Sequence, residues 1–329
     1  MKGRLSGLNR RQFLAAVAFA PLVAPNIARA ATYPDRPIRV VIPYTAGGVA
    51  ETVMRLLAVS MEQKLGQKFI IEAKPGAAGN IGTQEVARAE PDGYTLLVAA
   101  TNNYVINQFV MQMTFDPMKT LTPIARVSDV PLVIFSNPQA PARSMKDMID
   151  YARANPGKLA YGVPSLGTVN HLMMERLKLT TGADITAIPF RGSPEATLAL
   201  LKNDIQLFPI GLAAAGGHLK EGKVTALAAA TAKRLPMAPD IPTMEEAGFP
   251  GFTAANWWGL SAPAGTPPEI LDLLASAVAD AQQTQVVKDR FFALGMVGGG
   301  LNRAQFAAEL KREADFWADT VKRGNIRIR

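Results

Sequence analysis

The sequence has no cysteine and only two histidines, His171 and His218. Without cysteine there can be no disulfide, no thiolate nucleophile, no cysteine-ligated metal and no lipid anchor at a leader's cleavage site. The histidines lie about 47 residues apart. No His-Glu-x-x-His motif or aspartate-rich loop accompanies them, so we expect no metal site.

Long hydrophobic runs are also missing after residue 30, so no membrane-spanning helix is expected in that part of the chain. Residues 1–30 instead have the pattern of a secretory signal: a basic start, an apolar stretch (Phe13–Ala24) and an Ala-x-Ala pattern that ends at Ala30. The pair Arg10-Arg11, followed by Phe13-Leu14, favours twin-arginine export over an ordinary Sec signal. Both routes predict a periplasmic protein, cleaved after about Ala30.

A strong charge of one sign is absent once the signal is set aside. The whole chain has a formal net charge of +8, but five of its 35 basic residues and none of its 27 acidic residues lie in residues 1–30. The remaining balance of +3 is too mild to indicate nucleic acid as a partner. The remaining length is enough for two domains.

Short β-branched runs alternate with amphipathic helices, which predicts an α/β fold with parallel sheets covered by helices. The first unit pairs a strand at Ile38–Pro43 with a helix from about Val49 to Leu65, whose apolar residues recur with the period of one helical face. Gly66 is placed to end this helix. A later apolar strand is predicted at Val130–Pro138, and a C-terminal helix at Asn302–Gly324 with Asn302 as its N-cap.

Four glycine- or serine-rich turns follow predicted strands and precede helices: Thr45–Gly48, Gly76–Gly82, Ser165–Thr168 and Arg191–Ser193. Helix N-termini expose N–H groups and bind anions, and such loops gather at the carboxyl ends of the strands. We therefore expect several of these turns to converge on an anion.

The anion is not expected to be a nucleotide, and we predict no cofactor. The first turn lacks G-x-G-x-x-G, and no turn carries the Lys-Ser/Thr of a P-loop. Ser165 and His171 lie close together in the sequence, which leaves a hydrolase open as an alternative. No G-x-S-x-G elbow surrounds Ser165, so a binding or capping serine and a structural histidine are favoured.

The motifs "KPGAAGNIG" (Lys74–Gly82), "PDGYTLL" (Pro91–Leu97) and "APAGTP" (Ala262–Pro267) occur in order with further matching stretches along the chain. The sequence resembles the substrate-binding receptors of tripartite tricarboxylate transporters, the Bug-type receptors. The resemblance implies a two-lobed periplasmic binding protein of the type II, Venus flytrap kind, in which each lobe is a sheet flanked by helices. It also implies a monomeric receptor, not an enzyme, that passes a small carboxylate to membrane permease subunits.

The resemblance further implies two crossings between the lobes, near Arg126–Val130 and Gly251–Asn256. Domain 1 would comprise residues 31–128 and 253–329, and domain 2 residues 129–252. The ligand-binding residues implied in domain 1 are Tyr44, Thr45, Gly47, Gly48, Glu51, Asn80, Gly82, Thr101 and Asn102. Those implied in domain 2 are Ser165, Gly167, Thr168, His171, Arg191 and Gly192. For Arg191, a surface cation at a helix start is an equally good interpretation.

Two departures from the family pattern concern ligand choice. Glu51 stands where the family usually has aspartate, and the family's aspartate near Ile210 and Gly211 is missing from "GLAAAGG" (Gly211–Gly217). These changes favour an apolar pocket, and hence an aromatic or extended carboxylate over a small amino acid. The sequence does not separate a transport receptor from a sensor that signals to a membrane kinase.

Overall fold

The computed structural model describes residues 33–328 and shows an α/β fold. The predicted signal and its cleavage site lie outside these residues. None of the helices in the described part is both long and apolar enough to cross a membrane.

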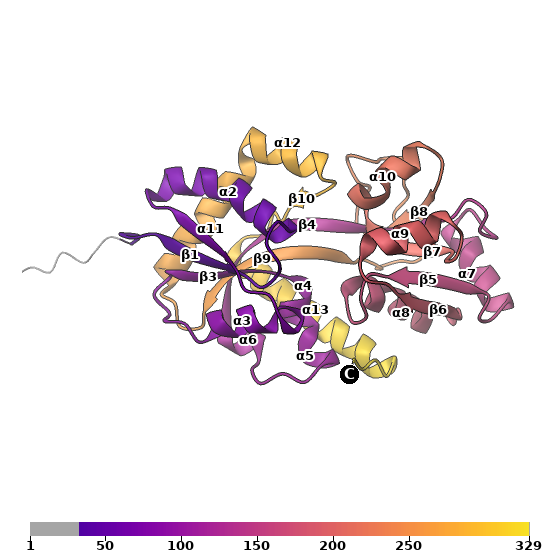
Figure 1. The fold of residues 1–329 in the computed structure, drawn as a ribbon, viewed down its shortest axis with the longest axis horizontal. Helices are drawn as coiled ribbons and strands as arrows, with labels where there is room; N and C mark the ends of the chain where they lie inside the picture. Colours follow the sequence, from indigo (N-terminus) through magenta and orange to yellow (C-terminus); the bar gives the residue numbers. More distant parts are fainter. Residues whose placement is uncertain (1–32, 329) are drawn as a thin grey trace, which may run out of the picture.

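Lobe 1 is built on one half of a bent sheet (Figure 1). Its strands are β1 (Ile38–Ile42), β2 (Phe69–Ala73), β3 (Thr95–Ala100) and β9 (Ala255–Pro263), in the order β2-β1-β3-β9. β1 is parallel to both of its neighbours, whereas β9 is antiparallel to β3. The carboxyl ends of β1 and β3 therefore face the same side of lobe 1, as the strand-turn-helix pattern predicts.

The long strand β4 (Leu121–Ser136) belongs to both lobes. Its first part, through Pro131, pairs with β9, and from Leu132 onward it pairs with β7 and β8. Lobe 2 continues the sheet in the order β4-β7-β5-β6. Its strands are β5 (Leu159–Val163), β6 (Ile185–Pro189), β7 (Leu207–Gly211) and β8 (Thr225–Ala229), while the short β10 (Val297–Gly298) pairs with β4 in lobe 1.

Helices flank both halves of the sheet, and in lobe 1 α2, α11 and α12 lie on one face while α3, α6 and α13 lie on the other (Figure 1). Those of lobe 1 are α2 (Val49–Leu65), η1 (Ala77–Gly79), α3 (Asn80–Ala87), α4 (Thr101–Val105), α5 (Asn107–Val110), α6 (Pro117–Thr120), α11 (Pro268–Gln283), α12 (Gln285–Ala293) and α13 (Arg303–Arg323). Those of lobe 2 are α7 (Met145–Ala154), α8 (Val169–Thr181), α9 (Ser193–Leu201) and α10 (Leu212–Lys220).

Helix α2 has the predicted bounds, and its apolar face explains why. Val53, Leu57 and Met61 are fully buried, one turn apart along the helix. Gly66 ends the helix in the left-handed conformation, with φ of 70°, where its N–H donates to Glu62 O. Asn302 likewise caps α13 as predicted, through a capping box with Gln305.

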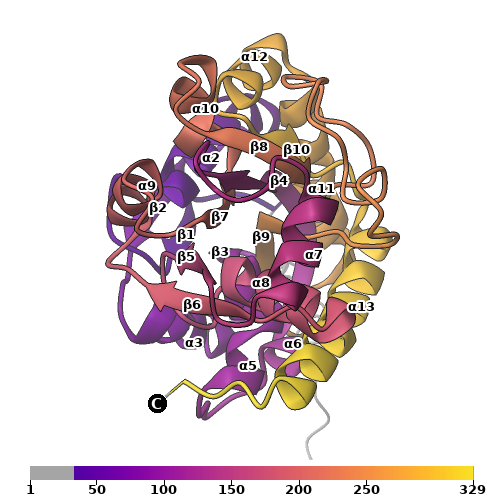
Figure 2. The ribbon, with the colours of Figure 1, turned by 90° about the vertical axis from the view of Figure 1, so that its right-hand side faces the viewer.

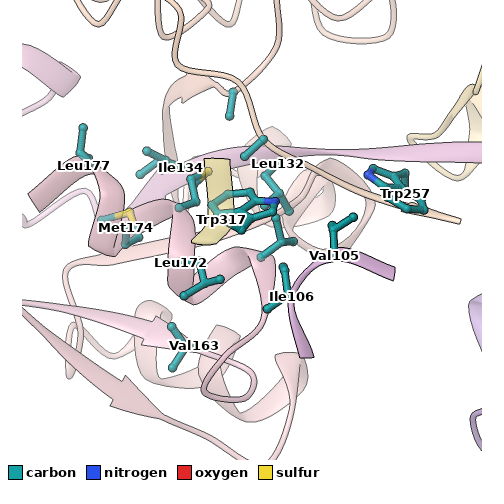
Figure 3. Packing of buried hydrophobic residues seen from close by; sticks show 14 of the residues in the cluster. Val105, Ile106, Leu132, Ile134, Val163, Leu172, Met174, Leu177, Trp257 and Trp317 are labelled. Atoms are coloured by element: carbon teal, nitrogen blue, oxygen red, sulfur yellow. The ribbon is translucent and has the colours of Figure 1, made fainter. Parts of the chain in front are cut away.

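Helix α13 connects the lobes through a shared core. It packs against α4 of lobe 1, against β4 and against α8 of lobe 2, and it lies beside α8 when lobe 2 faces the viewer (Figure 2). Figure 3 shows Trp317 of α13 among Leu132 and Ile134 of β4 and Leu172 of α8. The lobes are therefore in apolar contact on the α13 side of the sheet.

The strand pairing indicates where the chain passes from one lobe to the other. The outward passage is on β4, where the pairing partner changes between Pro131 and Leu132. The chain returns at β9, since Ala254 N–H donates to Ala230 O directly before this strand. The domain boundaries stated above stay a prediction.

Candidate functional site

A cavity of about 710 Å³ lies between the lobes, with residues of both in its wall. From lobe 1 come the loop that follows β1, the start of α4 directly after β3, the turn before α3, and β9. From lobe 2 come the loop that follows β5, the start of α9 and the end of β7. This is where loops at the carboxyl ends of parallel strands are expected to form a ligand site.

The loop after β1 is closed by Glu51, the third residue of α2. Its Oε2 accepts from Gly47 N–H at 2.8 Å, and its Oε1 accepts from Arg55 Nε at 2.7 Å. The Gly47 N–H and the neighbouring Arg55 guanidinium hold the pKa of Glu51 below its usual value. Glu51 is therefore ionised and holds its own loop in place. The N–H of Gly47 already donates to this carboxylate.

Two further helix starts near the cavity, those of α8 and α9, are built in the same way. In α8, His171 Nδ1 accepts from Gly167 N–H at 3.1 Å, and in α9, Glu195 Oε2 accepts from Arg191 N–H at 2.8 Å. Each acceptor is the third residue of its helix, and each donor directly precedes the N-cap. The same hydrogen bond, from the residue before the N-cap to the third residue of the helix, thus holds three separate loops in shape.

The same helices keep their first N–H groups free of side-chain caps. The N-caps Gly48, Thr168 and Gly192 make no side-chain capping hydrogen bond. The first N–H groups of a helix have no intrahelical acceptor, and they carry the positive end of the helix dipole. Helix starts from both lobes can therefore hold an anion without a cationic side chain.

His171 is buried and acts as a support for its loop. Burial lowers its pKa, and its ring stacks on Tyr161 with centroids 6.5 Å apart. Ser165 Oγ contacts Leu166 O at 3.5 Å. The hydrogen bonds of Ser165 and His171 thus go to loop backbone, and the two side chains do not form the pair that a serine hydrolase would need.

Six of the residues predicted at the site line the cavity: Tyr44, Thr45, Asn102, Ser165, Gly167 and Thr168. Asn102 Nδ2 donates to Gly167 O at 2.8 Å, which joins the start of α4 in lobe 1 to the loop after β5 in lobe 2. Tyr44 lies edge-to-face against Trp258, with ring centroids 5.4 Å apart.

The other predicted residues lie outside the wall: Gly47, Gly48, Glu51, Asn80, Gly82, Thr101, His171, Arg191 and Gly192. Several have a structural task. Thr101 Oγ1 accepts from Trp257 N–H at 2.9 Å, and Asn80 Oδ1 accepts from Asn107 Nδ2 at 2.8 Å. A Cβ on Gly82 would lie 2.8 Å from Lys74 O, so only glycine suits this packing. Ligand contact by any of these residues stays a prediction.

The structure adds wall residues that the sequence analysis did not single out, among them Asn107, Asn170, Ser193, Asn256 and Trp258. Ser193 starts α9 inside a turn that was predicted to bind an anion, so position alone could have suggested it. Asn256 and Trp258 lie on β9, whose neighbours in the sheet come from distant parts of the sequence. No local pattern could have placed them here.

Comparison with known proteins identifies the chain's family. Residues 53–325 match the model of the Tripartite tricarboxylate transporter family receptor. The chain belongs to this family. The predicted Bug-type resemblance is thereby confirmed. Protein BugT of Bordetella pertussis is 33% identical over 315 residues, covering 95% of this chain and 96% of BugT.

Solved structures of similar proteins agree with this membership. R. palustris Rpa4515 with adipate is 33% identical, with a TM-score of 0.76 over 90% of this chain and 100% of that one. MatC (Rpa3494) from Rhodopseudomonas palustris with bound malate is 31% identical, with a TM-score of 0.72 over 88% and 100%. The predicted α/β architecture of a periplasmic binding protein is confirmed.

Proposed function

We propose that this receptor captures one small carboxylated organic compound between its lobes and delivers it to the membrane subunits of a tripartite tricarboxylate-type transporter. The observation that carries the proposal is the cavity between the lobes, flanked by uncapped helix starts from both. A carboxylate suits these N–H groups. The adipate and malate bound by the two similar receptors support this ligand class.

Capture works through closure of the lobes. A ligand favours a closed form only if it makes contacts there that the open form lacks. A carboxylate between the loops of α2 and α8 meets this condition, because the two helices belong to different lobes. The bond from Asn102 to Gly167 O is a protein contact of the same kind, and it stabilises the same arrangement.

The proposal includes the location and state of the working protein. Residues 1–30 serve as the export signal, and cleavage after about Ala30 releases the mature chain into the periplasm. The mature receptor acts as a monomer whose domain 2 comprises residues 129–252. The membrane subunits then recognise the closed form and take up the ligand. Uptake of the ligand is what distinguishes transport from kinase signalling.

The experiment is a thermal-shift screen of mono-, di-, tricarboxylic and aromatic acids on the mature protein, followed by calorimetry with the best ligand. Gly48→Leu tests the site: Gly48 has φ of −78°, and its Cβ would be 3.4 Å from Thr45 O, so the fold should tolerate the change. The larger side chain at the helix start is expected to abolish binding. Gly216→Leu is the control, because a Cβ at this position meets no atom within 4 Å.

Normal binding by Gly48→Leu would contradict the proposed place of the carboxylate. Uptake of the bound acid by cells that carry the membrane subunits, with and without the receptor, tests delivery. Receptor-independent uptake, together with ligand-dependent stimulation of a membrane kinase, would contradict the transport role.

A further inference from the structure

The chain turns sharply where α13 ends. Asn325 has a φ of 48°, a left-handed conformation that asparagine tolerates better than most residues. Its N–H donates to Lys322 O at 3.3 Å, and the N–H of Ile326 donates to Val321 O at 3.0 Å, which together form a Schellman motif. Ile326 is 8% exposed. The turn is therefore fixed, and residues 326–328 leave the helix in a defined direction, toward α5 (Figure 2).

Ile328 is the residue of this segment that reaches the cavity between the lobes. Its N–H donates at 3.0 Å to the carbonyl oxygen of Val110, the last residue of α5, which attaches the segment to lobe 1. Its side chain is one of those that line the cavity, and it is only partly buried. The same side chain packs against lobe 2, because a Cβ on Gly167 would lie 1.9 Å from Ile328 Cδ1. Ile328 thus fills the space between the two lobes at this end of the cavity.

Ile328 also lies beside a helix start that can hold an anion. Gly167 directly precedes Thr168, the N-cap of α8, which makes no side-chain capping hydrogen bond. Apolar side chains of both lobes, Met111 and Leu166, line the same cavity. A carboxylate at this helix start would interact with its first N–H groups. The carbons that adjoin such a carboxylate therefore share the space beside Gly167 with the side chain of Ile328.

We infer that Ile328 determines specificity at this site: its side chain limits the bulk of the acid at the carbon next to the carboxylate. The inference rests on the proposed function. Protein interiors are close-packed, so a methyl group added to the ligand at this point has no room unless its neighbours shift. Isoleucine yields little, because a β-branched side chain is restricted in its rotamers. The preferred ligand class is therefore a carboxylic acid that is unbranched beside its carboxylate.

The experiment compares matched acids by calorimetry on the mature protein. Hexanoate is paired with 2-methylhexanoate, adipate with 2,5-dimethyladipate, and benzoate with 2-methylbenzoate. In each pair that binds, we expect the wild type to bind the branched acid about 10-fold more weakly, since one methylene group too many in an apolar pocket has an effect of this size.

The variant Ile328→Ala keeps only the Cβ of the side chain and opens the space beside Gly167. We expect the branched acid of each pair to gain about 10-fold relative to the unbranched acid, which removes most of the difference. Ile70→Ala, which alters an isoleucine on β2 that is 50% exposed and outside the cavity, is the matched control and keeps the preference. Ile328→Val makes the same test with a smaller change in size, in case Ile328→Ala does not fold.

The outcomes separate a size limit from a structural role, and the inference from the proposed function. If Ile328 served only to hold the lobes together, Ile328→Ala would weaken both acids of a pair by the same factor, and the size limit would be refuted. It would also be refuted if the wild type bound the branched acids as tightly as the unbranched ones; in both cases the receptor stands. If none of these acids binds, the proposed carboxylate receptor fails.

Discussion

Substitution of Asn102 by alanine tests whether closure of the lobes contributes to affinity. Asn102 Nδ2 donates to Gly167 O across the cavity at 2.8 Å. Its lobe 1 side chain and the lobe 2 carbonyl meet only when the lobes are together. In an open form both groups can bond to water, so the bond favours closure and contributes little to the folding of either lobe.

The size of the effect follows from the net value of one hydrogen bond, about 0.5 to 1.5 kcal/mol. A ligand that binds the closed form must supply this free energy when the bond is absent. The dissociation constant of Asn102→Ala is therefore expected to rise about 2- to 13-fold, because each 1.4 kcal/mol corresponds to a factor of 10. The melting temperature without ligand should change little.

Calorimetry with the best ligand from the screen measures this change. The matched control is Asn155→Ala, which removes a similar bond, from Asn155 Nδ2 to Tyr151 O at 3.0 Å, outside the cavity. Unchanged affinity in Asn102→Ala would refute the closure argument. A loss above about 100-fold would also refute it, since such a loss indicates a direct contact with the ligand.

Three further predictions concern stability. Burial lowers the pKa of His171, so below about pH 6.5 the unfolded chain binds a proton at this residue that the folded protein does not bind. In urea unfolding, the wild type should therefore lose stability on acidification, and His171→Gln should lose less. Gly167→Ala puts alanine at φ of 71°, with its Cβ 1.9 Å from Ile328 Cδ1; urea unfolding should show a loss of about 1 to 2 kcal/mol, partly restored by adding Ile328→Ala. Arg126→Met leaves two partly buried carboxylates, Asp129 and Glu313, without their cation, and urea unfolding should show a loss of up to about 3 to 5 kcal/mol.

Each of these three has its own contrary result. An equal response to acid in wild type and His171→Gln would assign the proton to another group. Full recovery in the Gly167/Ile328 double variant would mean that the clash, and not the backbone conformation, causes the loss. A loss below about 1 kcal/mol in Arg126→Met would place its carboxylates in contact with water.

Local signals predicted the helices well, because each signal acts within one turn of the chain. The apolar face of α2 and the glycine after it set the helix bounds, and Asn302 caps α13. Strand β4 shows the limit of such signals. Its apolar end was predicted from Val130, whereas the strand starts at Leu121. The missed part contains Pro123 and is stabilised by pairing with β9, more than a hundred residues later.

The candidate site was predicted only in outline for the same reason. Glycine-rich turns before helices indicated where an anion could bind, and the structure brings their loops around one cavity. The sequence did not show that Glu51 and His171 bond to their own loops. That result depends on side-chain rotamers and burial. It gives both residues a supporting role in the loops around the cavity, and ligand contact by them stays a prediction.

The two faces of β9 suggest which part of the receptor moves. Trp257 is fully buried on one face, where it donates to Glu313 of α13 and packs against Phe306. Trp258 lies on the cavity face. A ligand at Trp258 thus meets a strand whose other face is fixed to a long helix, so this wall has little freedom to adjust. We therefore expect closure to move the loops of lobe 2 toward β9, which remains in place.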